Sequence, residues 1–221
     1  MRKINFLLIL ISIWYSAEVI AQAKPRFWED VQTIKQYDKI YAPPKDPILF
    51  VGSSSFRVWN DLERAFADYG VLNRGVGGTV INDIAYYIND LIIPYHPCQI
   101  VLYVGENDLA NEKTTSDSIL FRTKRLLTLI SENLPNVPVV YISLKPSPVR
   151  EKYLNKLVLS NKLIRDYIST QNNMCFIDVY RLMVTPDGKP RPELFREDRL
   201  HMNSRGYDIW KKAIKPYLLK R

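Results

Sequence analysis

Two residues near the C-terminus, Asp198 and His201, have the types and the spacing of an acid and a base that act together. The chain contains only one other histidine, His96, which lies in the turn-like stretch 94–97. A carboxylate three residues before a histidine can hydrogen-bond the imidazole and fix its orientation. Far upstream, Ser54 follows an apolar, strand-like run at 48–51. A serine at a strand end, an acid and a histidine are the parts of a nucleophilic hydrolase.

Ser54 is the candidate nucleophile. A serine hydroxyl is unreactive until an adjacent base takes its proton. Gly52 permits a tight turn from strand to helix, which would leave the backbone N–H of Ser54 pointing outward at a helix start. The structural alternative is that this serine-rich stretch, 53–55, only caps a helix, a role that serine fills well.

Two further segments could donate hydrogen bonds to a reacting carbonyl group. The glycine-rich loop with Gly77 and Gly78 allows close approach of backbone N–H groups, and Asn107 presents a side-chain amide just past a strongly apolar run. Each has a structural alternative, namely a flexible loop before a helix capped by Thr79, and an Asx turn at Asn107. These pieces make one site only if the fold brings them together.

Strand-like and helix-like segments alternate along most of the 221 residues. The predicted strands are 48–51, 70–73, 100–104, 139–143 and 176–179, and the predicted helices between and after them are 58–68, 80–91, 116–133, 152–170 and 204–219. The alternation predicts a three-layer α/β/α sandwich with a five-stranded parallel sheet. Ligands bind such folds at the carboxyl ends of the strands, where Ser54, Gly78 and Asn107 each follow a strand. We therefore expect one site at that edge.

The sequence resembles the SGNH or GDSL hydrolase superfamily in four short blocks, which occur in the family's order. The resemblance covers about residues 46–219, and the blocks are Phe50-Val51-Gly52-Ser53-Ser54-Ser55, Asn73-Arg74-Gly75-Val76-Gly77-Gly78, Gly105-Glu106-Asn107-Asp108 and Asp198-Arg199-Leu200-His201. The resemblance implies a flavodoxin-like SGNH hydrolase fold. It also implies a serine esterase (an acylhydrolase) that uses neither a cofactor nor a metal.

The resemblance further implies a role for each matching residue. Ser54 would be the nucleophile, and its own N–H would be the first donor of the oxyanion hole. Gly78 would supply the second donor and Asn107 the third. His201 would take the proton of the serine hydroxyl, and Asp198 would orient the imidazole.

One block departs from the family pattern. The usual Gly-Asp-Ser-Leu reads Gly52-Ser53-Ser54-Ser55 here, so that a serine replaces the aspartate before the nucleophile. That aspartate is not one of the catalytic groups, and the departure does not exclude activity. It leaves Ser53 and Ser55 open as alternative nucleophiles, and Gly77 remains the alternative to its neighbour as a donor.

The substrate is less defined by the sequence than the reaction. Members of the family hydrolyse short acyl esters, lipids, thioesters and acetylated sugars. We expect short acyl or acetyl esters of polar alcohols such as glycans, with the proline-rich segment 143–148 as the substrate loop. Other loop residues that could contact substrate are Trp59, Arg74, Leu109, Lys145, Arg150 and Arg199, although solvation at the surface is the default for each charge.

Three alternatives to this esterase remain open. One is a lysophospholipase or thioesterase, and another is an inactive glycan-binding or cell-envelope protein on the same fold. A nucleotide-binding flavodoxin-like protein is the third, but the first strand is not followed by a phosphate-cradling glycine pattern. The net charge of +8 comes from scattered basic residues, which argues against a nucleic-acid surface.

The first 23 residues have the order of a secretory signal peptide. Arg2 and Lys3 precede the apolar run 4–15, and small residues follow at 21–23. We expect this segment to be removed, leaving a secreted or periplasmic protein without a membrane span, in which a helix and a proline-rich lead-in at 24–47 precede the hydrolase domain at 48–221. An uncleaved membrane anchor is the alternative, while the absence of a following cysteine argues against a lipoprotein.

The two cysteines, Cys98 and Cys175, each precede a predicted strand. Because another strand is expected between those two, the thiols would lie about 10 Å apart. We expect two separate, partly buried thiols rather than a disulfide, and their spacing does not suggest a metal site.

Overall fold

The computed structural model of the protein describes residues 24–220, in which five strands form one parallel sheet. The strands are β1 (Ile48–Gly52), β2 (Val71–Gly75), β3 (Gln99–Tyr103), β4 (Val139–Ile142) and β5 (Met174–Ile177). Their order across the sheet, β2-β1-β3-β4-β5, is that of a flavodoxin-like fold. The predicted fold class is therefore confirmed, whereas the predicted signal peptide at 1–23 lies outside the described residues.

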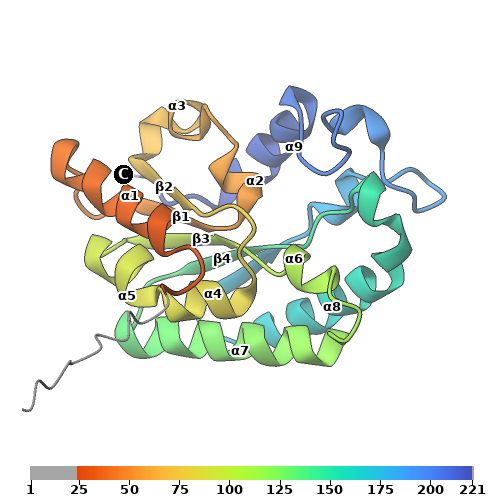
Figure 1. Ribbon diagram of the computed structural model, residues 1–221, viewed down its shortest axis with the longest axis horizontal. Coiled ribbons are helices and arrows are strands. Elements are labelled where there is room, and N and C mark those ends of the chain that lie inside the picture. The colour runs from red at the N-terminus through yellow and green to blue at the C-terminus, as the bar shows by residue number, and fades with distance from the viewer. Residues whose placement is uncertain (1–23, 221) are drawn as a thin grey trace, which may run out of the picture.

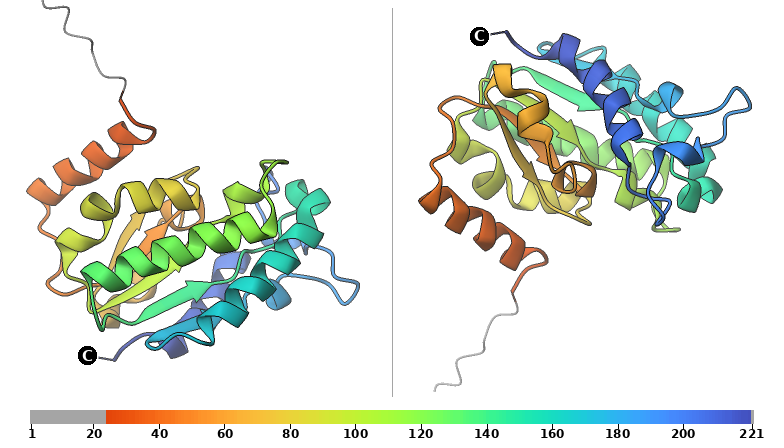
Figure 2. Two further views of the ribbon diagram at one scale, coloured as in Figure 1. Left: turned by 90° about the horizontal axis from the view of Figure 1, so that it is seen from below. Right: turned by 90° about the horizontal axis from the view of Figure 1, so that it is seen from above.

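Helices cover both faces of the sheet, which gives the three layers visible in Figure 1 and, from two other sides, in Figure 2. One face carries α4 (Ile81–Tyr86), α5 (Ile88–Leu91), α7 (Ser116–Asn133) and α8 (Leu154–Ile168). The other face carries α2 (Ser54–Arg57), α3 (Leu62–Ala65) and α9 (Ser204–Ile214). The N-terminal helix α1 (Trp28–Ile40) packs beside α5, and the short α6 (Glu106–Leu109) follows β3.

The pleat of the central strands divides their side chains between two cores. Leu49 and Val51 of β1 belong to the core under α7 and α8, whereas Ile48 and Phe50 face the core under α9. All five residues of β3 are buried, because helices cover both of its faces. This explains why residues 100–103 of the strand are all apolar, and it makes β3 a rigid support for the segment that follows it.

Several predicted boundaries were wrong, and the difference matters most beside Ser54. The predicted helix 58–68 is replaced by α2 and α3, so that the first helix after β1 begins at Ser54 itself. The predicted helix 80–91 is divided into α4 and α5 at Tyr87, and the helix predicted at 152–170 is a 3₁₀ segment, Pro148–Tyr153, followed by α8. Proline at the first position of that segment favours such a tight start.

The cysteine prediction is confirmed. Cys98 and Cys175 are partly buried and no disulfide joins them. Cys98 directly precedes β3, whereas Cys175 lies within β5, and β4 separates these two strands. None of the helices within residues 24–220 is both long enough and apolar enough to span a membrane.

Candidate active site

The four sequence blocks meet in one cleft of about 410 Å³ at the carboxyl edge of the sheet. Its lining consists of Asp30, Ser54, Arg57, Val58, Gly77, Gly78, Asn107, Leu200 and His201. These residues come from the segments after β1, β2 and β3 and from the loop before α9, with Asp30 added by α1. The carboxyl-edge rule thus correctly predicted that Ser54, Gly78 and Asn107 lie together, whereas Asp30 of α1 was not expected there.

Ser54 is the serine of the 53–55 stretch that reaches the cleft. Ser53 and Ser55 are each only 2% exposed. The backbone N–H of Ser53 donates to the Tyr103 carbonyl of the neighbouring strand, while the Ser55 carbonyl accepts a hydrogen bond from Tyr207 in α9. Accessibility to a substrate therefore favours Ser54 over its two neighbours.

Gly52 makes the approach to Ser54 possible. Its φ is +147°, and a Cβ placed there would lie 1.9 Å from the Tyr103 carbonyl oxygen. Only glycine lets β1 pass so close to β3 at this point. The chain then turns directly into α2, which puts the Ser54 side chain at the sheet edge.

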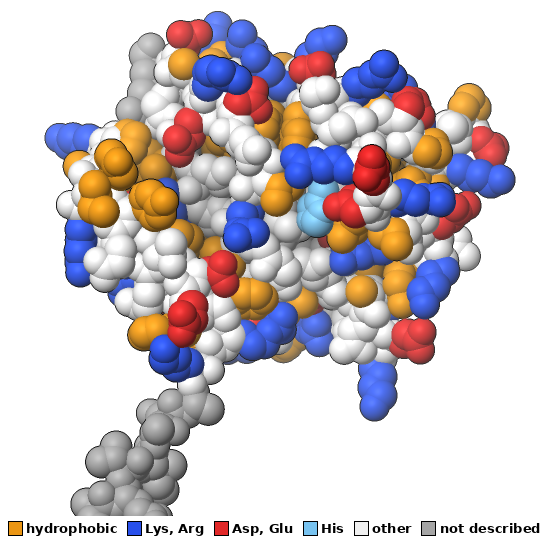
Figure 3. Space-filling view, turned by 45° about the horizontal axis from the view of Figure 1, so that its top comes forward, with side chains coloured by type: hydrophobic (Ala, Val, Ile, Leu, Met, Phe, Trp, Pro, Cys, Tyr) orange, Lys and Arg blue, Asp and Glu red, His pale blue; other side chains and the backbone are white. Residues whose placement is uncertain are grey.

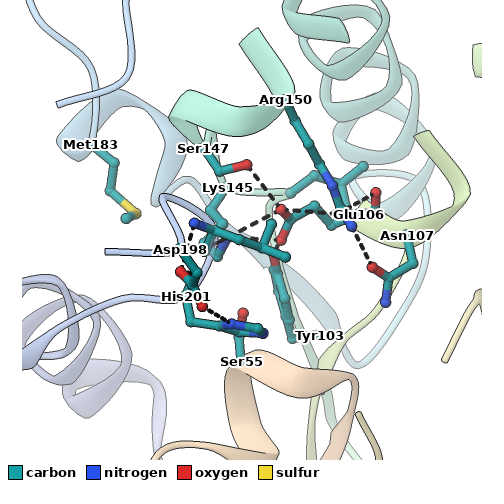
Figure 4. A network of polar contacts seen from close by, with 12 residues as sticks. Ser55, Tyr103, Glu106, Asn107, Lys145, Ser147, Arg150, Met183, Asp198 and His201 are labelled. Atoms are coloured by element: carbon teal, nitrogen blue, oxygen red, sulfur yellow. Dashed lines mark hydrogen bonds and ion pairs between the residues drawn. The ribbon is translucent and has the colours of Figure 1, made fainter. Parts of the chain in front are cut away.

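Asp198 and His201 form a tightly hydrogen-bonded pair (Figure 4). His201 Nδ1 lies 2.6 Å from Asp198 Oδ2, and the backbone N–H groups of Leu200 and His201 both donate to Asp198 Oδ1 at 2.9 Å. Burial alone would raise the pKa of Asp198, but these hydrogen bonds lower it to about 2. The carboxylate is therefore charged at neutral pH and can stabilise a proton on the ring.

Because Nδ1 pairs with Asp198, Nε2 is the nitrogen of the His201 ring that could act as a base. The ring is partly exposed, with 24% of the side chain accessible, and it lines the same cleft as Ser54. Within residues 24–220, no hydrogen bond directly joins the Ser54 hydroxyl to the His201 ring. Such contacts are often long before substrate binds and tighten in the complex.

The start of α9 fixes the loop that carries the histidine. Asn203 caps this helix, since its Oδ1 accepts hydrogen bonds from the N–H groups of Arg205 and Gly206. Its Nδ2 donates to the carbonyls of Glu193 and Phe195 on the opposite strand of the loop. The side chain two residues after His201 is thus locked to both the helix and the loop.

Three donors are available around the cleft. Within the described residues, the backbone N–H groups of Ser54 and Gly78 make no hydrogen bond. Gly78 has a φ of +81°, a left-handed conformation that favours glycine. Asn107 Nδ2 donates one hydrogen to the Thr79 carbonyl at 2.9 Å, while its Oδ1 accepts from Arg150 at 2.7 Å. The second hydrogen of Asn107 Nδ2 remains available to a ligand.

The prediction that segment 143–148 forms the substrate loop is wrong. All of its residues are buried, and Lys145 has a side chain that is only 1% exposed. Lys145 and Arg150, which we expected at the surface or against substrate, instead form ion pairs with Glu106 behind the cleft. The sequence analysis missed Glu106, for which the only signal was its place directly before Asn107.

The other expected substrate contacts also lie elsewhere, with one exception. Trp59 and Leu109 are buried in the two cores, and Arg74 forms an ion pair with Asp38 and donates to the Tyr95 hydroxyl. Arg199, beside the Asp198–His201 pair, stays exposed and has a φ of +56°.

The face of the molecule shown in Figure 3 carries no concentrated stripe of Lys and Arg side chains. Basic and acidic side chains alternate over it, and a histidine reaches the surface among them. Among residues 24–220, no cluster of three or more histidine, cysteine, aspartate or glutamate side chains could hold a metal ion.

Comparison with known proteins identifies a family whose sequence pattern the chain matches. The sequence model of the GDSL-like lipase/acylhydrolase family matches residues 46–209. No match was found to a curated protein.

Solved structures share the fold at low sequence identity. A GDSL-like lipase from Bacteroides thetaiotaomicron is 22% identical with a TM-score of 0.74, covering 86% of this chain and 97% of that one. A lipase/acylhydrolase from Enterococcus faecalis is 21% identical with a TM-score of 0.63, covering 79% and 98%. An acetyl xylan esterase from Geobacillus stearothermophilus is 13% identical with a TM-score of 0.63, covering 80% and 97%.

Proposed function

The chain belongs to the GDSL-like lipase/acylhydrolase family, and from this premise we propose that it is a serine esterase that forms an acyl-enzyme on Ser54. The observation that carries the proposal is the single cleft lined by Ser54, Gly78, Asn107 and His201. These residues are far apart in the sequence, and a purely structural role for each would not require them to share a cavity. Together they supply a nucleophile, a base and oxyanion donors.

Acylation begins with proton transfer. Nε2 of His201 takes the proton of the Ser54 hydroxyl as its oxygen attacks the ester carbonyl carbon. Asp198, charged and bonded to Nδ1, stabilises the imidazolium that results. When the tetrahedral intermediate collapses, the C–O bond to the alcohol breaks and the imidazolium returns its proton to the leaving oxygen. Water then repeats the sequence on the acyl-enzyme, releasing the acid and the serine.

The oxyanion forms where donors converge. The N–H groups of Ser54 and Gly78 and one hydrogen of Asn107 Nδ2 line the cleft without a partner among the described residues. Donors fixed in advance lower the barrier because they need not reorient as charge develops. The orientation of the Asn107 amide is set on both sides, by the Thr79 carbonyl and by Arg150.

We propose short acyl or acetyl esters of a polar alcohol, such as an acetylated glycan, as substrates. Supporting this, the residues that border the cleft beyond the catalytic groups include Asp30 and Arg57, which suit a hydroxylated partner better than a long hydrocarbon chain. The acetyl xylan esterase among the structural neighbours shares the fold. We also propose export of the protein, on the signal-like order of residues 1–23.

Hydrolysis of p-nitrophenyl acetate tests the proposal. Ser54→Ala should remove nearly all turnover, whereas Ser53→Ala, at a neighbouring serine that is buried, should retain it. A panel of acetylated sugars and esters of increasing acyl length then tests the substrate, with kcat/KM expected to fall as the chain lengthens. Equal turnover by wild type and Ser54→Ala would overturn the proposed nucleophile.

A further inference from the structure

A cluster of buried polar groups lies directly behind the cleft, centred on Glu106 (Figure 4). Lys145 Nζ lies 2.9 Å from Glu106 Oε2, and Arg150 Nη1 lies 3.1 Å from Glu106 Oε1. The hydroxyl of Tyr103 donates to Oε2 at 2.6 Å, and that of Ser147 donates to Oε1 at 3.3 Å. We call these five residues the Glu106 cluster.

One side of the Glu106 cluster reaches the asparagine of the cleft. Arg150 uses Nη1 to donate to the backbone carbonyl of Glu106 at 2.9 Å and Nη2 to donate to Asn107 Oδ1 at 2.7 Å. The planar guanidinium therefore holds the backbone before Asn107 and the amide of its side chain in a fixed relation. A cation that donates to the amide oxygen also polarises the amide, which makes its N–H a stronger donor.

The other side reaches the peptide that carries the histidine. Lys145 Nζ donates to the Leu200 carbonyl at 2.8 Å. That carbonyl belongs to the same planar peptide unit as the N–H of His201, which donates to Asp198 Oδ1. The peptide unit is thus held at both ends, by Lys145 on one side and by Asp198 on the other.

Stability alone is a weak explanation for such a cluster. The side chains of Glu106 and Lys145 are 5% and 1% exposed, and that of Arg150 is 14% exposed. Burial lowers the pKa of Lys145. Burial alone would raise the pKa of Glu106, but the two neighbouring cations, Lys145 and Arg150, lower it. Buried ion pairs often stabilise a protein no more than well-packed apolar side chains would. In some proteins, buried ionic groups of this kind instead fix one arrangement of the chain.

We propose that Glu106, Lys145 and Arg150 are positioning residues that hold the oxyanion donor Asn107 and the base His201 in register with each other. The proposal rests on the esterase function proposed above, and it assigns to these residues no contact with substrate. The short helix α6 after β3 and the loop before α9 are joined through one carboxylate, that of Glu106. Moving either loop by about 1 Å can cost on the order of 10²-fold in rate.

Steady-state kinetics of Arg150→Met test the connection to Asn107. We expect kcat to fall about 10- to 100-fold with little change in KM, because substrate binding does not use the arginine. Lys152→Met, on the same 3₁₀ segment but with a side chain that is 66% exposed, is the matched control and should retain wild-type kcat.

A double-mutant cycle separates positioning from a general structural effect. If Arg150 acts through Asn107, then adding Arg150→Met to Asn107→Ala should lower kcat only slightly further. Losses that multiply in the double variant, or an unchanged kcat in Arg150→Met, would overturn the proposal.

Lys145→Met tests the connection to His201 in the same way, with an expected fall in kcat of about 10- to 100-fold. If either methionine variant does not fold, Arg150→Lys and Lys145→Arg keep the charge but change the geometry, and kcat should still fall; an unchanged kcat would count against the proposal. A wild-type enzyme without Ser54-dependent turnover would instead refute the proposed function, so the two failures are distinguishable.

Discussion

Replacing Asn107 by alanine should lower kcat about 10²–10³-fold, which corresponds to about 2.7–4 kcal/mol of lost transition-state stabilisation. The hydrogen bonds of Asn107 explain why the expected loss is that of a single donor. One Nδ2 hydrogen is used by the Thr79 carbonyl and Oδ1 is used by Arg150, so at most one hydrogen reaches an oxyanion. The substitution therefore removes one donor, while the backbone donors at Ser54 and Gly78 remain. KM should change little because the donor acts mainly on charge that develops in the transition state.

The same substitution also affects folding, and the two effects can be separated. Two hydrogen bonds are lost, one of them to a cation, which should lower the free energy of unfolding by about 2–4 kcal/mol. Typical domains are stable by about 5–15 kcal/mol, so the variant should remain folded. Urea denaturation measures this change directly.

Asn107→Asp provides the matched control for the donor itself. Its carboxylate keeps an oxygen for Arg150 but has no N–H, so kcat should fall at least as far as in the alanine variant. Hydrolysis of p-nitrophenyl acetate by the folded variants gives kcat and KM. A folded Asn107→Ala with unchanged kcat, or a fully active Asn107→Asp, would refute the assigned role.

Two further predictions concern folding. Gly52→Ala should lower the free energy of unfolding by more than ~2 kcal/mol, because the added Cβ would collide with the Tyr103 carbonyl. Gly188→Ala is the control: its φ is +80° but the space around it is open, so the free energy of unfolding should fall by only ~1–2 kcal/mol. Equal losses of stability for the two variants in urea denaturation would contradict the packing argument. The pKa of Asp198 is lowered to about 2, against the effect of burial, by hydrogen bonds from His201 and the backbone. A depressed pKa contributes stability that is present above the unfolded value of ~3.9 and is lost as the pH falls towards 2. Wild type should therefore exceed Asp198→Asn in stability more at pH 6 than at pH 2, and a difference that does not change with pH would argue against this pairing.

The sequence was sufficient to predict the class of fold and the edge that carries the site. Apolar runs such as 100–104 identify buried parallel strands by composition alone, and the topology then determines where the following loops meet. That is why Ser54, Gly78 and Asn107 could be assigned to one edge without coordinates. Their exact geometry depended on local details such as the start of α2 at Ser54.

The buried charges could not be predicted in the same way. Lys145 and Arg150 come from a stretch of sequence rich in proline and polar residues, where a charged side chain is usually solvated. Both pair with one carboxylate, that of Glu106 about 40 residues earlier in the chain, and only packing in three dimensions brings the three together. Arg74 is a similar case, because its partner Asp38 comes from α1. Long-range ion pairs of this kind leave no periodic signal in a sequence.

The most direct test of the central claim is to identify the residue that a fluorophosphonate modifies. Such a probe phosphonylates a serine that a neighbouring base activates, and peptide mapping by mass spectrometry locates the added mass. The label is expected on Ser54 in the wild type, at a strongly reduced rate in His201→Ala, and absent in Ser54→Ala. Labelling of Ser53 or Ser55, or no serine labelling in the folded wild-type protein, would contradict the account.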